Sequence, residues 1–245
     1  MKDKIKKIIT DSFILALITA KFKAWYLNLP MFIYRLKFVF KNHLGKNVKF
    51  IGARRISLGR NVVIGSGSWI NVNDRFSEGI CFQICDNSFI GRDNFFTVGH
   101  SITIREYCLT AKNCSFIGST HIYDDPFKPY IATGTTNLDA IYVGVNCFFG
   151  LGAQVLGNVH IGHGCIIGAG AVVRDNIPPF SLVVGNPAKV VKRFDFDKKK
   201  WIKWSTNAPF KEGLDEDTYL RELRQWRPWL IHPISAADSR RRDIM

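Results

Sequence analysis

One register constrains the fold of this chain more than any other feature. Six apolar residues spaced six apart fill the stretch from 143 to 173: Val143, Phe149, Val155, Ile161, Ile167 and Val173. Four positions after each of them lies another residue that can be buried: Cys147, Ala153, Val159, Cys165, Ala171 and Ile177. An α-helix repeats about every 3.6 residues and a strand about every two, so neither explains this period. A hexapeptide period predicts an all-β parallel β-helix, in which three hexapeptides form one triangular coil around an apolar interior.

The same register occurs earlier in the chain, with interruptions. Three apolar residues are again six apart: Leu58, Ile64 and Ile70. The polar stretch 73–79 predicts a loop, and the register shifts by two residues through 96–98. Residues 119–142 lack the period altogether and predict an excursion loop, which in a compact domain is usually functional. The repeats predict a β-helix domain over residues 47–193.

Positive charge is concentrated at the ends of the chain. The 245-residue sequence has a formal net charge of +14. Residues 1–60 hold 14 Lys and Arg against two acidic residues, whereas 61–191 hold seven against nine and 192–245 hold 13 against nine. A basic N-terminal end fits either an anionic surface, such as phospholipid or acidic polysaccharide, or a solvated positive face. The sequence contains no nucleic-acid-binding motif, so nucleic acid is not an expected partner.

Most of the six cysteines fall on the small buried position of the repeat. These are Cys108, Cys114, Cys147 and Cys165. We expect them to be compact core residues rather than disulfides or metal ligands. Cys81 and Cys85 have no second pair at a metal-binding spacing, so no metal site is expected. Free thiols in this number are typical of a reducing cytoplasm.

The C-terminal half of the repeat region resembles a known family. Residues 143–191 include IGHGCIIGAGAVVRDNIPP and VVGNPAKVVKR, and they resemble the hexapeptide-repeat acyltransferases. Within that group the chain is similar to the sugar and polysaccharide O-acetyltransferases, beside the galactoside, maltose and xenobiotic acetyltransferases. The resemblance covers residues 47–193. It implies a left-handed parallel β-helix, acetyl-CoA as co-substrate, and a homotrimer with active sites between subunits.

One histidine stands apart as a candidate base. Acetyl transfer to a hydroxyl needs a proton acceptor near neutrality, and histidine has a suitable unperturbed pKa. His121 leaves the coils at the root of the excursion loop, and in the resembling families a histidine ahead of a loop with a proline, here Pro126, is the catalytic base. Tyr123, Asp124 and Asp125 could orient it or contact the acceptor. No cysteine adjoins His121, which favours direct attack over an acyl-enzyme.

The resemblance also implies where coenzyme A binds. Matched motif by motif, the family's coenzyme contacts fall on Leu151 and Ala169 through the backbone. They fall also on Arg174 and Lys189, whose charges suit the phosphates, although both residues could equally be solvated surface charges. The backbone amide of Gly150 or Leu151 is a candidate oxyanion donor.

Two features depart from the family's pattern. The tryptophan that often flanks the site is Phe148 here, which becomes a candidate substrate contact. The polar residue, often asparagine, that assists the acceptor from an earlier coil cannot be placed, because the register shifts at 96–98. Among the other histidines, His160 and His163 are expected on the surface.

Helical segments are expected on both sides of the repeats. Residues 1–46 are basic and apolar, but their unbroken apolar run, 13–20, is too short to span a bilayer, and Asp11 argues against a cleaved signal. This segment could pack on the open end of the column or lie as an anchor in the membrane interface. Residues 194–245 are expected to form a helical extension and a tail, with a helix at 215–226 capped by its first residue.

These features predict an acetyl-CoA-dependent O-acetyltransferase acting on a sugar hydroxyl. The acceptor would be a surface polysaccharide, such as capsule or O-antigen, or its precursor, and could be anionic or lipid-linked. The enzyme would work in the cytoplasm or at the inner membrane face. N-acetylation of an amino sugar, including a nucleotide-linked one, is an alternative. A non-catalytic or metal-binding scaffold is another, although His121 lacks a partner histidine at the spacing that a trimer-interface metal site needs.

Overall fold

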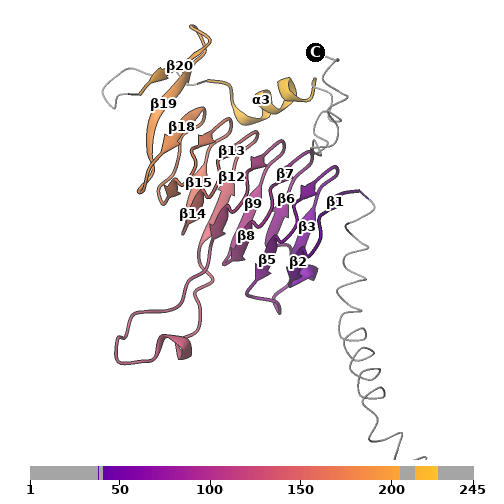
Figure 1. Ribbon diagram of the computed structural model, residues 1–245, viewed down its shortest axis with the longest axis vertical. Coiled ribbons are helices and arrows are strands. Elements are labelled where there is room, and N and C mark those ends of the chain that lie inside the picture. The colour runs from indigo at the N-terminus through magenta and orange to yellow at the C-terminus, as the bar shows by residue number, and fades with distance from the viewer. Residues whose placement is uncertain (1–37, 39–40, 205–212, 226–245) are drawn as a thin grey trace, which may run out of the picture. The chain divides into compact units, whose positions relative to one another are not determined.

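The structure of the protein is a computed structural model, which describes residue 38 and residues 41–204 and 213–225 (Figure 1). Apart from residue 38, the described residues belong to one compact unit that begins at Lys41. The predicted N-terminal helical segment therefore lies almost entirely outside the described residues, as does the chain after residue 225. Within the described part of the chain, no helix is long and apolar enough to cross a membrane.

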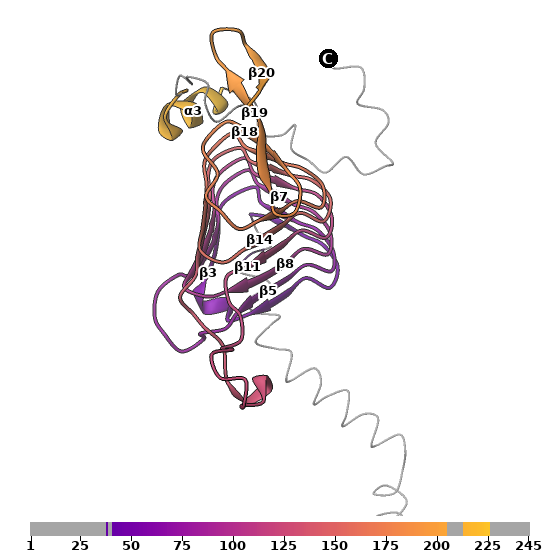
Figure 2. The ribbon, with the colours of Figure 1, turned by 90° about the vertical axis from the view of Figure 1, so that its left-hand side faces the viewer.

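Short strands stack into three sheets that form the sides of a triangular column (Figure 2). In spatial order, the described strands of the nine-stranded sheet are β1 (His43–Leu44), β4 (Val63–Ile64), β7 (Phe89–Ile90), β10 (Leu109–Thr110), β13 (Phe148–Phe149), β16 (Ile166–Ile167), β18 (Ser181–Val184), β19 (Lys189–Asp195) and β20 (Lys200–Lys203). The six-stranded sheet contains β17 (Val172–Val173), β14 (Gln154–Leu156), β11 (Ser115–Ile117), β8 (Phe95–Val98), β5 (Trp69–Val72) and β2 (Lys49–Ile51). The five-stranded sheet contains β15 (Val159–Ile161), β12 (Ala140–Val143), β9 (Ser101–Ile104), β6 (Phe82–Ile84) and β3 (Ile56–Leu58).

Successive coils are in register, so equivalent repeat positions lie one above another. Thr110, for example, pairs with Ile90 on one side and Phe149 on the other. The six apolar residues that define the repeat from 143 to 173 are all 0 % exposed, which confirms the predicted interior. A column of aromatic rings continues this core, with centroids of neighbouring rings 4.9–5.3 Å apart: Phe82, Phe96, Phe116 and Phe149. The four cysteines predicted to be core residues are free and buried.

Glycine at the corners is required because the coils stack closely. A Cβ atom on Gly144, Gly150 or Gly162 would lie 2.5 Å from a backbone nitrogen of the next coil. Cβ atoms do not approach backbone so closely, so any side chain at these positions would push two coils apart. The glycines of the repeat therefore set the spacing of the column.

Each coil passes from the nine-stranded to the six-stranded to the five-stranded sheet, and the edge between the last two carries the insertions. We call it the loop edge. Residues 73–81, between β5 and β6, and residues 118–139, between β11 and β12, leave the column there, and the second segment projects as the predicted excursion loop (Figure 1). The register shift at 96–98 falls on the same edge, where β8 and β9 are each one residue longer than β14 and β15. Two 3₁₀ turns also lie along this edge, η1 (Ala53–Arg55) and η2 (Tyr130–Ala132).

The chain beyond the column differs from the prediction in its first part. Residues 194–204 were expected to begin a helical extension, but they lie mainly in β19 and β20, which run antiparallel to each other beyond β18. The physical reason is cross-strand packing, since Phe194 pairs with Trp201 with ring centroids 5.5 Å apart. The parallel column also begins at β1, four residues before the predicted start at residue 47.

The predicted C-terminal helix is present. Helix α3 (Glu216–Leu223) begins after Asp215, whose carboxylate accepts a hydrogen bond from the Thr218 N–H at 3.0 Å. Hydrogen bonds from the side chain and the backbone N–H of Thr218 lower the pKa of Asp215, as expected for a helix N-cap. The helix lies along the edge where the chain passes from the five-stranded to the nine-stranded sheet, which we call the helix edge.

Candidate active site

His121 lies on the loop edge, four residues after the end of β11. Its backbone forms an isolated antiparallel bridge with Thr135, so the two ends of the excursion loop pair at this point. The side chain is exposed, and its ring makes no hydrogen bond with any residue that the structure describes. Both ring nitrogens are therefore available to a substrate.

Hydrogen bonds close the base of the excursion loop around this histidine. The Thr136 N–H donates to the Thr120 carbonyl at 2.8 Å. The Ser119 hydroxyl, in a residue that is 7 % exposed, donates to the Thr136 carbonyl at 2.7 Å. His121 is thus held in a short two-stranded hairpin rather than on an unsupported loop.

The three candidate acceptor contacts lie further out in the excursion loop. Tyr123 is 69 % exposed, and Asp124 is also exposed. Asp125 pairs with Lys128 at 3.4 Å. None of these three residues forms a hydrogen bond with the His121 ring in the described part of the chain, so none of them orients the ring here. They stay candidates for contact with an acceptor.

Leu151 and Ala169 lie together on the third edge, between the nine-stranded and six-stranded sheets. The Gly170 N–H donates to the Leu151 carbonyl at 2.8 Å, and both Leu151 and Ala169 are exposed. The Gly150 N–H donates to the Ile167 carbonyl at 2.7 Å within the sheet, so it is not available to an oxyanion. The Leu151 N–H makes no hydrogen bond with the described residues and stays a candidate oxyanion donor.

The two basic coenzyme candidates flank β17. Arg174 follows this strand on the loop edge and is exposed. Lys189 begins β19, and its Nζ lies 3.8 Å from the carboxylate of Asp175. An exposed ion pair of this length contributes little to the stability of the fold, so a phosphate could replace the carboxylate as the partner of Lys189.

One chain does not bring the predicted base and all the predicted coenzyme contacts together. His121 is on the loop edge, whereas Leu151 and Ala169 are on the third edge, with the six-stranded sheet between them. Arg174 shares the loop edge with His121, two strands further along the six-stranded sheet. Acetyl transfer needs the acceptor, the base and the thioester within contact distance of one another.

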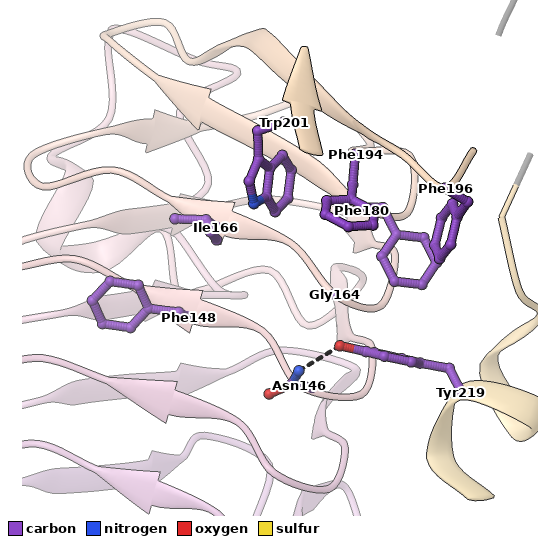
Figure 3. Close-up of a pocket in the computed structure, with 9 residues that line it drawn as sticks. All are labelled: Asn146, Phe148, Gly164, Ile166, Phe180, Phe194, Phe196, Trp201 and Tyr219. Carbon is purple, nitrogen blue, oxygen red and sulfur yellow. Dashed lines mark hydrogen bonds between the residues drawn. The ribbon is translucent and has the colours of Figure 1, made fainter. Parts of the chain in front are cut away.

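Phe148 lies on a different side of the column from His121. It lines a pocket of about 430 Å³ on the nine-stranded sheet (Figure 3). The walls are mostly aromatic: Asn146, Phe148, Gly164, Ile166, Phe180, Phe194, Phe196, Trp201 and Tyr219. The Asn146 amide donates to the Tyr219 hydroxyl at one end of the pocket. Within one chain, therefore, Phe148 does not flank His121.

The polar groups of the helix edge are occupied in holding α3. The carboxylate of Glu216 accepts hydrogen bonds from the Tyr142 hydroxyl and from the Val145 N–H, each at 2.7 Å. It also lies 3.5 Å from the guanidinium of Arg105. Burial and the hydrogen bond to Glu216 raise the pKa of Tyr142 to about 12.

His163 contradicts the prediction that it is a surface residue. It is 7 % exposed, and its Nε2 donates to the Leu214 carbonyl at 2.8 Å. Its ring also contacts Phe180 and Tyr219, with centroids 4.8 and 5.7 Å away. The physical reason is α3, which covers a corner that the repeat alone would leave exposed. His160 is exposed, as predicted.

Two cysteines, Cys85 and Cys147, are poor nucleophiles. Burial raises the pKa of the Cys147 thiol far above its usual range. Burial also raises the pKa of Cys85 to about 12. Because the thiolate is the reactive form, these groups are inert near neutral pH. Within the described ranges, no group of three His, Cys, Asp or Glu side chains is placed to hold a metal ion.

Sequence analysis missed a polar cluster beside the base of the excursion loop: Asn71, Asn73, Thr97 and Ser119. Its members come from three successive coils and face the loop edge. The pairing of Asn71 with Thr97 could have been found only by aligning the coils across the insertions, whose lengths the sequence does not reveal.

Comparison with known proteins supports the fold. No family model matches the sequence. A protein of Mycobacterium tuberculosis described as a probable acetyltransferase is 28% identical over 146 residues, which cover 58% of this chain and 46% of that protein. The chain thus spans about half the length of the curated relative that it matches.

Crystal structures of AntD, an N-acyltransferase from Bacillus cereus, share the architecture. A mutant in complex with dTDP and coenzyme A has a TM-score of 0.53 at 17% identity, covering 68% of this chain and 89% of that one. A second mutant, in complex with dTDP-4-amino-4,6-dideoxyglucose and coenzyme A, has a TM-score of 0.53 at 15% identity, covering 69% and 91%. The hexapeptide register, the three-sided column and these likenesses show that the chain has the left-handed parallel β-helix fold of the hexapeptide-repeat acyltransferases.

Proposed function

We propose that the protein is an acetyl-CoA-dependent O-acetyltransferase that acts on a sugar hydroxyl of a surface polysaccharide or its precursor. The observation that carries the proposal is the position of His121, exposed at the root of the only long excursion loop of the described column, with no described partner for its ring. The 28% identity with a probable acetyltransferase supports the same chemistry.

Each step needs one group of the chain. The His121 imidazole takes the proton of the acceptor hydroxyl as its oxygen attacks the thioester carbonyl. The Leu151 N–H donates a hydrogen bond to the oxyanion of the tetrahedral intermediate. When the carbon–sulfur bond breaks, the imidazolium returns the proton to the coenzyme A thiolate. Direct attack agrees with the burial of Cys108, Cys114, Cys147 and Cys165 inside the column, away from the loop edge that carries His121.

The proposed active sites lie between subunits of a homotrimer. His121 and the pair Leu151 and Ala169 lie on different edges of one column, so a second copy is needed to bring an imidazole to the coenzyme groove. Arg174 and Lys189 would then contact the coenzyme phosphates. Tyr123, Asp124 and Asp125 would contact the acceptor from the excursion loop.

A second candidate is N-acylation of a nucleotide-linked amino sugar. It is favoured by the likeness to AntD, which was crystallised with coenzyme A and such a sugar. The same base and the same coenzyme groove would serve a sugar hydroxyl or a sugar amine. The two candidate functions are therefore distinguished by testing which acceptors support turnover.

The decisive experiment measures release of coenzyme A thiol from acetyl-CoA with a panel of sugars, amino sugars and serine. We expect turnover with sugar hydroxyls, and amine acceptors alone would support the second candidate. His121→Ala should lower kcat by about 10²- to 10⁴-fold, the usual contribution of general base catalysis, without loss of acetyl-CoA binding. His160→Ala, which removes another exposed histidine, is the matched control. Full activity of His121→Ala would contradict the assignment.

A further inference from the structure

A relay of side chains crosses the loop edge and ends at the hairpin that carries His121. The Asn71 amide donates to the side-chain carbonyl of Asn73 at 2.7 Å. The Asn73 amide donates to the Ser119 hydroxyl at 2.7 Å, and this hydroxyl donates to the Thr136 carbonyl at 2.7 Å. The side chains of Asn73 and Ser119 each accept a hydrogen bond from the preceding group and donate one to the next. The relay thus joins the turn after β5 to both ends of the excursion loop.

Ser119 is the central member of this relay. Its hydroxyl donates its one proton to the Thr136 carbonyl and accepts from the Asn73 amide through one of its two lone pairs. The residue is 7 % exposed, and Thr97, which also contacts Asn73 at 3.3 Å, is 9 % exposed. Removing the Ser119 hydroxyl would take one hydrogen-bond partner from the Thr136 carbonyl and one from the Asn73 amide in a part-buried site, which is costly.

The relay fixes the part of the loop from which His121 projects. His121 follows Ser119 by two residues and pairs with Thr135, which precedes Thr136. Its own ring has no described partner, so its position depends on the backbone that carries it. A base misplaced by about 1 Å can cost on the order of 100-fold in rate.

We propose that Asn73 and Ser119 are positioning residues, which hold the His121 hairpin against the column at the distance that proton transfer requires. This inference rests on the proposed function of His121. It also means that the two insertions of the loop edge act as one unit, because Asn73 begins one of them and Ser119 lies in the other.

The test compares Ser119→Ala and Asn73→Asp with wild-type protein. Asp has nearly the shape of Asn but lacks the N–H that donates to Ser119. Each variant should lower kcat about 10- to 100-fold and leave the KM for acetyl-CoA unchanged. The double variant should be no worse than the poorer single variant, since both changes break one relay. Ser119→Thr, which keeps the hydroxyl, should recover most of the activity, and Ser115→Ala on β11 is the matched control.

Two further measurements separate positioning from other roles. In a His121→Ala background, Ser119→Ala should lower the residual rate no further. The inference is overturned if Ser119→Ala lowers the residual rate of His121→Ala by the same factor as it lowers the rate of the wild-type protein. It is also overturned if kcat is unchanged in the single variants Ser119→Ala and Asn73→Asp. Hydrogen exchange of residues 119–123 and 133–137 should rise about tenfold in both variants, while the coils keep their protection.

Hydrogen exchange also separates this inference from the proposed function. An inactive wild type or a fully active His121→Ala would remove the proposed function. Unchanged exchange at the hairpin would remove the relay, whatever the activity.

Discussion

The loop edge and the helix edge of the same column use histidine in opposite ways. On the helix edge, His163 is buried between two aromatic rings and its Nε2 is hydrogen-bonded to the Leu214 carbonyl. On the loop edge, His121 is exposed and its ring has no partner among the described residues. The residue type and the scaffold are the same, so the difference comes from what covers each edge. The histidine of the covered edge is used for packing and hydrogen bonding, whereas the histidine of the uncovered edge stays exposed.

Shortening the excursion loop should give the largest effect, a loss of activity toward the acceptor. Replacing residues 124–132 by Gly-Gly keeps the pairing of His121 with Thr135 but removes the acceptor candidates Asp124 and Asp125. We expect kcat/KM for the acceptor to fall on the order of 100-fold, while the KM for acetyl-CoA and the unfolding temperature stay unchanged. Acceptor kinetics and thermal unfolding check this. A column that unfolded with the loop would show that the loop edge also serves stability.

His163→Ala should instead lower the stability of the protein and leave its activity nearly unchanged. Losing the ring leaves a cavity and an unpaired Leu214 carbonyl, so we expect a loss of about 2–3 kcal/mol in the free energy of unfolding. The kcat should stay within about twofold of wild type, because proton transfer is assigned to His121. Urea unfolding measures the loss, with the exposed His100→Ala as the control, for which about 0.5 kcal/mol or less is expected. A loss of activity without loss of stability would break the comparison.

Glu216→Gln tests how α3 is held. The amide keeps the shape of the carboxylate but removes its charge, which weakens the bonds from Tyr142, Val145 and Arg105. We expect the free energy of unfolding to fall by about 1–2 kcal/mol and hydrogen exchange in α3 to become faster. Exposed Glu222, in the same helix, provides the control variant Glu222→Gln. Equal effects of the two changes would show that the contacts of Glu216 do not hold the helix.

Tyr142→Phe should give the smallest effect on stability, and it should change the pH dependence of stability only at high pH. The pKa of Tyr142 is raised from 10.0 to about 12 in the folded protein, so the folded state keeps its proton where the unfolded chain loses it. The contribution of this group to stability is therefore complete below pH 10 and is lost as the pH rises toward 12. The variant should show a shallower fall in unfolding free energy between pH 10 and 12. An identical slope in both proteins would contradict this.

The column itself could be predicted from the sequence because its signal is local and repeated. Interior positions such as Phe149 recur at an interval that a three-sided coil satisfies, and the interval holds without a break from residue 143 to residue 173. His121 could be singled out for a related reason, since it lies where the repeat stops. The N-cap at Asp215 was visible as well, because capping depends on a few neighbouring residues.

Contacts between distant segments could not be predicted in this way. The burial of His163 depends on α3, which lies about fifty residues further along the chain. The relay from Asn73 to Ser119 joins residues 46 positions apart across two insertions whose lengths follow no rule. The strand at β20 was missed because its pairing with β19 depends on a partner rather than on its own period.

The amino-acid sequence alone therefore determined the coil, its apolar interior and the residue at which the chain leaves it, because a period of six recurs along the column and stops where the excursion loop begins. Only the tertiary structure decided which edge is covered by a helix, which histidine is buried, and which side chains hold the hairpin of His121. The physical reason is that burial and hydrogen bonding at an edge depend on segments that the repeat does not contain.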